Sequence, residues 1–278
     1  MAGPHRWIAT TPSSWVAGSF DTNLLPASNE IVRFDGSAQG DCIGGLNQTA
    51  VDLDLLEVHP SYYGRIGVEG NPLIISADEV ILQGRGTTHY QDGDGTTDLM
   101  IVDSDNLQQA VKLYSGTFTR VRLLKGRTVL GPLFSTVITD LEVGSRGQPD
   151  TDVRLDGLRS SLSTFTRFRM NAGYVTGIAG ISSVGSGQYA MVSGGTWRCG
   201  GLFGNPLLLS GGLVIWDSLV SSAGATLLQV DPVHIMGGTL DARLGGPKQI
   251  DDLYLWPEAQ FLYNDDTMTV ATTRRMEP

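Results

Sequence analysis

Short apolar stretches recur along the chain and are separated by clusters of Gly, Asn, Asp and Ser. They are rich in β-branched and aromatic residues, which is typical of buried or half-buried strands. No long stretch has apolar residues at the i, i+3, i+4 and i+7 positions of a helix. The pattern predicts an all-β chain with strands at residues 56–58, 80–82, 99–101, 121–123, 137–138, 153–155, 168–170, 190–192, 214–216, 233–235 and 253–255.

The centres of these stretches lie about 20 residues apart, which is the length of one coil in a solenoid. A repeated phrase supports the same period: GNPLIIS at residues 70–76 returns as GNPLLLS at residues 204–210, 134 positions later. Each copy is followed by an apolar triplet, at residues 80–82 and 214–216. We expect both phrases to form one type of corner, about six coils apart, with residues 131–133 as a weaker third copy.

Glycine and proline positions are consistent with regular corners. Gly116, Gly195 and Gly238 each precede a Thr and a large apolar residue, at intervals of 79 and 43 residues, which predicts about four and two coils. Proline cannot donate to a central strand but is tolerated at its first residues. We therefore expect strands to begin just after the prolines at positions 72, 132, 206 and 232.

Together these patterns predict a right-handed parallel β-helix, because crossovers between parallel strands are overwhelmingly right-handed. An antiparallel β-sandwich, which also has short strands and Gly-rich turns, is the structural alternative. We expect an N-terminal cap or attachment segment at residues 1–45, a solenoid at 46–241, and a C-terminal cap and tail at 242–278. The tail sequence TMTV could instead pair with a neighbouring subunit.

Composition narrows the class of protein. Gly contributes 36 of 278 residues, which suits many tight turns, and the formal net charge of −10 argues against nucleic-acid binding. The N-terminus lacks the pattern of a secretory signal, and no apolar run is long enough to span a membrane. Cys42 and Cys199 are expected to be free thiols in a reducing cytoplasm, although one bridge between them is possible.

One acidic segment resembles a calcium loop. Asp92, Asp94, Thr96, Asp98 and Asp103 occupy positions 1, 3, 5, 7 and 12 of such a loop. The sixth position is Thr instead of Gly, the twelfth is not Glu, and no helices flank the segment. We expect a solvated turn and no metal site.

Catalytic signatures are also weak. The adjacent carboxylates of Asp251 and Asp252, and of Asp265 and Asp266, would face opposite ways on a strand, although acids from different coils could still meet. No nucleophile elbow or phosphate-binding loop is present. The histidines, which also lack a signature partner, are at positions 5, 59, 89 and 234. We expect no catalytic residues, no cofactor and no metal.

Basic residues alternate in two stretches, so that they would stand outward on one strand face. The outward stripe could meet an acidic partner or a neighbouring subunit, or pair with acids on the next coil of the same chain. Its residues are Arg120, Arg122, Lys125, Arg127, Arg167 and Arg169.

The segment WVAGSFDTNLLPASNEIVRFDG, with Trp15 and the run at residues 26–34, resembles the opening of β-helical virion proteins of tailed bacteriophages and of some bacterial β-helical surface proteins. In these proteins a short capping segment leads into Gly-rich coils like the YYGRIGVEGNPL of this chain. The likeness is specific over roughly residues 7–75. It implies a structural virion protein, a homotrimer assembled in the host cytoplasm and released by lysis. Within that class, a short solenoid without a carbohydrate-cleaving site is more similar to a capsid decoration or cement protein than to a tailspike. Such a protein binds the major capsid protein.

Two other function classes remain open at this point. A tailspike-type polysaccharide depolymerase or receptor-binding protein would carry an acidic groove along the solenoid. A cellular adhesin would require an export signal that the N-terminus does not show.

Overall fold

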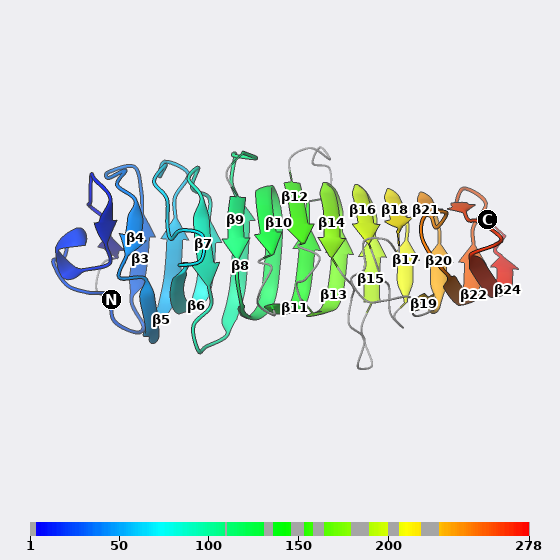
Figure 1. The fold of residues 1–278 in the computed structure, drawn as a ribbon, viewed down its shortest axis with the longest axis horizontal. Coiled ribbons are helices and arrows are strands. Elements are labelled where there is room, and N and C mark those ends of the chain that lie inside the picture. The colour runs from blue at the N-terminus through cyan, green and yellow to red at the C-terminus, as the bar shows by residue number, and fades with distance from the viewer. Residues whose placement is uncertain are drawn as a thin grey trace. The chain divides into compact units, whose positions relative to one another are not determined.

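The computed structural model describes residues 4–108, 110–130, 136–145, 153–157, 164–178, 189–199, 206–217 and 228–277. These residues form β-strands and one short 3-10 turn, η1 (Ala17–Ser19). The strands stack in parallel as successive coils of a β-solenoid (Figure 1), which confirms the predicted fold class. The hand of the coils stays a prediction. The chain divides into two compact units, Met1–Val137 and Ile138–Pro278.

The strands of the first unit are short at the N-terminus and longest in β5, β6 and β10. They are β1 (His5–Arg6), β2 (Ser13–Ser14), β3 (Ile31–Phe34), β4 (Cys42–Gly44), β5 (Asn47–Val58), β6 (Leu73–Leu82), β7 (Thr88–Gln91), β8 (Thr97–Asp103), β9 (Ala110–Leu113) and β10 (Gly116–Leu130). Strand β11 (Thr136–Val143) begins at the end of this unit.

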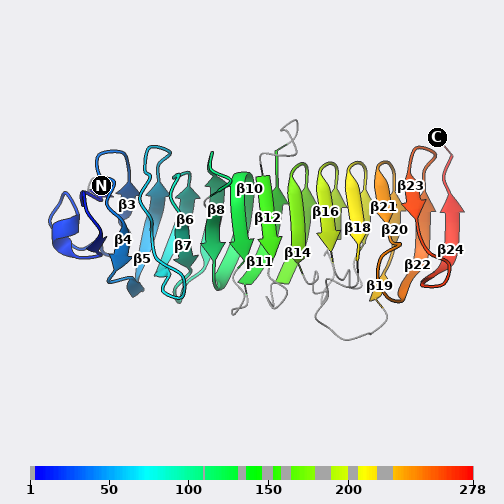
Figure 2. The same ribbon diagram turned by 45° about the horizontal axis from the view of Figure 1, so that its top comes forward.

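The second unit continues with more, mostly shorter strands (Figure 2). They are β12 (Val153–Gly157), β13 (Thr164–Met170), β14 (Tyr174–Ile178), β15 (Tyr189–Val192), β16 (Thr196–Cys199), β17 (Leu207–Leu209), β18 (Leu213–Trp216), β19 (Leu228–Val230), β20 (Val233–Ile235), β21 (Thr239–Asp241), β22 (Lys248–Leu255), β23 (Gln260–Leu262) and β24 (Met268–Arg275). Each predicted apolar stretch lies in one of the strands of the two units.

Inward side chains form ladders because paired strands are in register. In the first unit one ladder runs through β3, β5, β6, β8 and β10, and its buried members are Phe34, Val58, Leu82, Val102 and Leu123. Burying each such side chain contributes about 1.5–3 kcal/mol, and each is covered by the equivalent residue of the neighbouring coil. The core therefore exists only in the stack.

The second unit has two such ladders. One joins β13, β15, β17, β20 and β22, where Met170, Val192, Leu209 and Ile235 are buried. The other joins β12, β14, β16, β18, β21 and β23, with the inward residues Leu155, Val175, Trp197, Val214, Leu240 and Phe261 in register.

The strands that follow the two copies of the GNPL phrase differ, and the predicted likeness of the two corners stays a prediction because part of the second copy is not described. In the first copy, Val68 and Asn71 bridge across a small loop, and Leu73 then begins a single strand, β6, that also contains residues 80–82. The described part of the second copy leads into β17, and the triplet at residues 214–216 lies in a separate strand, β18. Leu73 of the first copy pairs with Tyr90 of β7, and Leu207 of the second copy pairs with Ala190 of β15 and Val233 of β20. Residues 131–133 and 204–205 lie outside the described residues.

The glycine prediction is confirmed within the second unit. Gly195, Gly212 and Gly238 all have positive φ, and they precede register-paired residues on β16, β18 and β21. Two coils therefore separate Gly195 from Gly238. A Cβ on Gly212 would lie 2.7 Å from the carbonyl oxygen of Gly195, so both the backbone conformation and the close stacking require Gly. Gly116 has a φ of 147° and faces Asp92, so it is a different kind of corner.

The described prolines behave as expected. Pro72, Pro206 and Pro232 immediately precede β6, β17 and β20, where no ladder hydrogen bond is lost. Pro132 lies outside the described residues.

Aromatic side chains fill the N-terminal end of the first unit. Phe20 packs edge-on against Trp7 and Trp15, with ring centroids 5.6 and 5.1 Å apart, and Phe34 packs against both indoles. Strand β1 already pairs with β3, so coil-like stacking starts near the first described residues. The boundaries predicted at residues 45 and 241 stay predictions.

The glycine corners give a stability test. We expect Gly212→Ala to lower the free energy of unfolding by about 2–4 kcal/mol, because it combines left-handed strain with a backbone clash. Gly18→Ala is the control, since its Cβ would meet only Asn23, 3.9 Å away. Urea unfolding of both variants checks this; equal midpoints would contradict the stacked corner.

Candidate functional site: an exposed row of alternating charge

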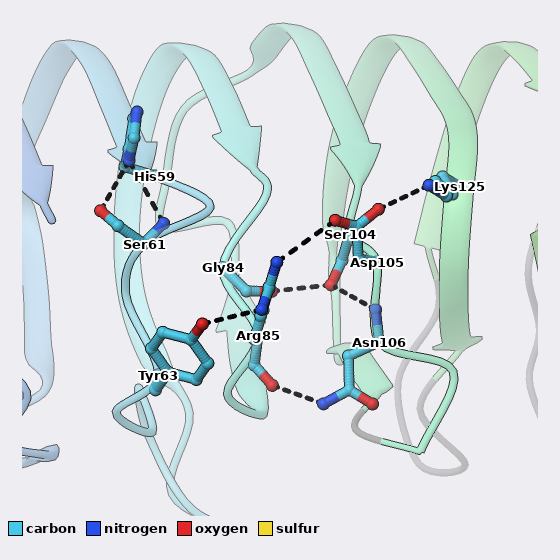
Figure 3. A network of polar contacts seen from close by, with 9 residues as sticks. All are labelled: His59, Ser61, Tyr63, Gly84, Arg85, Ser104, Asp105, Asn106 and Lys125. Atoms are coloured by element: carbon cyan, nitrogen blue, oxygen red, sulfur yellow. Dashed lines mark hydrogen bonds and ion pairs between the residues drawn. The ribbon is translucent and has the colours of Figure 1, made fainter. Parts of the chain in front are cut away.

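Four residues of successive coils, three at corners and one in a strand, form a polar row on the surface of the first unit (Figure 3). They are Tyr63, Arg85, Asp105 and Lys125, and their numbers rise in steps of 22, 20 and 20 residues, which is the coil period. The first three follow the ends of β5, β6 and β8, and Lys125 lies within β10. We call these four residues the corner row.

Contacts along the corner row alternate in charge. Arg85 donates from Nη1 to the Tyr63 hydroxyl at 2.7 Å, and its guanidinium lies 5.3 Å from the centroid of that ring. The Asp105 carboxylate forms ion pairs with Nη2 of Arg85 at 3.6 Å and with Nζ of Lys125 at 2.5 Å. The hydrogen bond and charge of Lys125, with Arg85, lower the pKa of the Asp105 carboxyl. Each such exposed pair contributes at most about 1 kcal/mol.

A second set of contacts fixes the backbone beneath the corner row. Ser104 donates from Oγ to the carbonyl oxygen of Gly84 at 2.7 Å, and Asn106 donates from Nδ2 to that of Arg85 at 2.7 Å. The Asn106 amide donates to Ser104 Oγ at 3.3 Å. The corners are therefore held from coil to coil, and the charged side chains project from fixed positions.

One contact near the corner row was not expected from the sequence. His59 Nδ1 lies 2.7 Å from Ser61 Oγ, as in a nucleophile and base pair (Figure 3). The same nitrogen also accepts the Ser61 backbone N–H at 3.2 Å, and Ser61 Oγ accepts the Gly36 N–H at 2.8 Å. These bonds lock a tight turn in the way that Asx turns do. The H-P-S spacing is the only signal that could have indicated the pair.

The basic stripe is outward, as predicted: Arg120 is exposed, and Arg122, Lys125 and Arg127 are half-buried. The stripe was expected to meet a partner or subunit, or to pair with acids of the same chain. Two of its residues pair within the chain: Lys125 with Asp105, and Arg167, which donates to Asp140 at 2.7 Å. Arg169 lies in the same strand as Arg167 and is half-buried.

Pairing between neighbouring coils extends beyond the stripe. Arg33 binds Glu57 at 2.6 Å, and Arg65 binds Asp41 at 2.7 Å. In the second unit Arg198 binds the buried carboxylate of Asp217 at 2.6 Å. The partners differ by 24, 24 and 19 positions, so opposite charges stack with the coils.

The calcium-like segment does not converge on one point. Asp98 and Asp103 lie near opposite ends of β8, about 17 Å apart along an extended strand, and Asp94 and Thr96 are exposed. Asp92 alone turns inward, with 2% of its surface exposed, and accepts bonds from the Thr117 amide and the Thr97 hydroxyl. Burial raises its pKa from 3.8 to about 6, against the opposing effect of these bonds.

The other acidic candidates take structural positions. Asp251 and Asp252 are neighbours on β22, and Asp265 and Asp266 lie in the turn before β24. Between neighbouring coils, a carboxylate oxygen of Asp231 accepts the Asp252 backbone N–H at 2.8 Å. That bond holds a corner, and Asp252 also faces Arg274 at 3.9 Å.

The cysteines and histidines also have structural surroundings. Cys42 and Cys199 are free and buried, and burial raises the pKa of both thiols. Buried His89 contacts the Tyr114 hydroxyl at 2.9 Å, and burial lowers the pKa of His89 to about 4.

The two remaining histidines lie at opposite ends of the chain. His5 is buried and contacts Glu30 at 2.9 Å, whereas His234 stacks on Tyr254.

Two further features were missed by the sequence analysis. Lys248 is buried and donates to the carbonyl oxygens of Ala242 and Leu244, which ties a corner of the second unit. The N-terminal end of the first unit exposes several large apolar side chains: Ile8, Val16, Leu24 and Leu25. We call these four residues the N-terminal apolar patch.

Within the described ranges, no three His, Cys, Asp or Glu side chains are grouped to hold a metal ion. None of the helices found there is long and apolar enough to cross a membrane. The described surface carries paired charges, exposed apolar side chains and hydrogen-bonded corners. Exposed apolar side chains bordered by polar ones are typical of surfaces that bind other proteins.

Asp92 makes stability depend on pH. Between about pH 4 and pH 6 the folded protein holds a proton that the unfolded chain has released, so stability falls as the pH rises through this window. Between pH 4 and pH 7 we expect the free energy of unfolding of wild type to fall by up to about 3 kcal/mol relative to that of Asp92→Asn. Asp94→Asn, at an exposed position of the same turn, should follow wild type; parallel curves for wild type and Asp92→Asn would refute this role.

Comparison of the chain with protein-family models, with curated proteins and with solved structures finds no match.

Proposed function

We propose that this protein is a non-enzymatic structural component of a tailed-bacteriophage particle, of the capsid-decoration or cement type. It binds the major capsid protein on the outer shell as a symmetric oligomer. The resemblance of residues 7–75 to β-helical virion proteins supports the phage assignment and implies a homotrimer assembled in the host cytoplasm.

The N-terminal apolar patch is the observation that carries the proposal. Leu24 and Leu25 are 64% and 51% exposed, and Ile8 and Val16 of the same N-terminal segment are exposed as well. Beneath the segment, Trp7, Trp15 and Phe20 are almost fully buried against one another, so the patch rests on a rigid base. A preorganised apolar surface is suited to binding because little conformational entropy is lost on contact.

The rest of the described surface supports a binding role more than a catalytic one. Along the coils, arginines and carboxylates are matched to each other, and the buried acids and histidines are engaged in corners and turns. A weak contact by one patch would still hold firmly when several copies bind a symmetric shell together, because linked sites raise the effective concentration.

One observation favours a receptor-binding or depolymerising tailspike instead. In the second unit His234 and Tyr254 stack with centroids 4.4 Å apart and planes 3° apart, and Arg274 lies 5.4 Å from the Tyr254 ring. Outward rings on successive coils offer a platform on which sugar rings could stack. This function would show itself as loss of host capsule when the protein is added.

Quantitative mass spectrometry of purified virions tests the assignment. We expect a copy number comparable to that of the major capsid protein. A small fraction of that number would favour the tail function, and absence from the particle would refute the virion proposal.

The attachment face can be tested separately with particles that lack the protein. We expect Leu24→Asp with Leu25→Asp to reduce rebinding at least tenfold, because two exposed apolar side chains are lost from the contact. Leu244→Asp, at a similarly exposed site in the second unit, is the matched control and should bind like wild type. Equal binding by all variants would exclude the N-terminal apolar patch as the attachment face.

A further inference from the structure

Strand β24 is the last strand of the second unit, and only one of its edges is paired. Met268 to Arg275 lie in parallel register with Lys248 to Leu255 of β22. On the opposite edge of β24, no strand pairs with it among the described residues. The strand has eight residues, most of them exposed, and contains neither proline nor a register shift toward β22. Those are the usual devices that keep an open edge from pairing.

An apolar hollow lies beside this edge. Its volume is about 500 Å³, and it is lined by the end of β22, the corner that leads to β23, β23 itself and the end of β24. Its large apolar side chains are Leu255, Trp256, Phe261 and Met276. Leu255 pairs with Arg275 of β24, whereas β23 pairs only with β21 in the described residues, so Phe261 has no further strand over it there.

Charge is arranged symmetrically along β24. Asp265 and Asp266 precede the strand, and Arg274 and Arg275 end it. Val270 is the midpoint of both pairs, 265 with 275 and 266 with 274. Asp265 and Asp266 lie in the turn before the strand, so an antiparallel second copy centred on Val270 would bring the acidic turn of each copy near the arginine end of the other. A second copy of the same chain therefore carries the complementary charges at both ends of the strand.

We propose that the open edge of β24 binds the same edge of a second copy of this chain, antiparallel and about a two-fold axis near Val270. The two strands exchange backbone hydrogen bonds, the facing ends cover the hollows, and attraction between the acidic turn of one copy and the arginine end of the other favours the antiparallel direction. This inference does not depend on the virion assignment. A two-fold end contact also combines with a three-fold trimer without conflict, giving dihedral symmetry.

Charge reversal with rescue tests the pairing. By light scattering during gel filtration, wild type should show assembly in multiples of two chains of 29.7 kDa. Arg275→Glu and Asp265→Lys should each weaken the two-fold contact about tenfold or more, because two attractive pairs per contact become repulsive. The double variant restores opposite charges and should recover wild-type assembly. High salt should weaken the wild-type contact.

Matched controls separate this effect from net charge. Asp78→Lys and Arg120→Glu make the same charge changes at exposed positions of the first unit and should leave assembly unchanged. A monomeric wild type at its highest soluble concentration would overturn the proposal. So would a trimer, or any assembly, that is unaffected by both single reversals, or a double variant that fails to recover. Virion copy number is measured independently, so either proposal can fail alone.

Discussion

In-register stacking of coils is the interaction on which the rest of this structure depends. A single coil of about 20 residues cannot enclose its inward side chains, and ladder residues such as Leu82 are buried because Val58 and Val102 lie against them on the neighbouring coils. The requirement acts on every coil at once. It fixes which residues face inward, how closely the corners approach, and where outward side chains fall.

The corners and the surface follow from this constraint. Coils at strand spacing leave no room for a Cβ where one corner backbone lies over another, which explains the positive-φ glycines at positions 195, 212 and 238. The same spacing brings outward residues of neighbouring coils within reach, so that Arg33 meets Glu57 and Asp105 lies between Arg85 and Lys125. The ends differ, because there a ladder stops and apolar side chains or strand edges stay open.

Much of the fold could be predicted from the sequence, because a strand that must be buried in a ladder has to be apolar at the coil period. The strands around Val80 and Val214 and the two-coil interval from Gly195 to Gly238 follow from that pattern. The lengths of the strands after the two GNPL phrases did not, since seven local residues do not determine how far the following strand runs. Contacts between coils, such as Arg85 with Tyr63, depend on corner geometry that no local pattern encodes.

Disulfide trapping measures the register of the stack directly. Ile81 and Ile101 are half-buried, register-paired residues of β6 and β8, so their Cα atoms should lie about 5 Å apart, within the range of a disulfide. Ile81→Cys with Ile101→Cys should therefore cross-link on oxidation. Ile81→Cys with Asp103→Cys, about 8 Å apart in the same stack, should not. Cross-linking of the second pair, or of neither, would contradict the parallel coils described here.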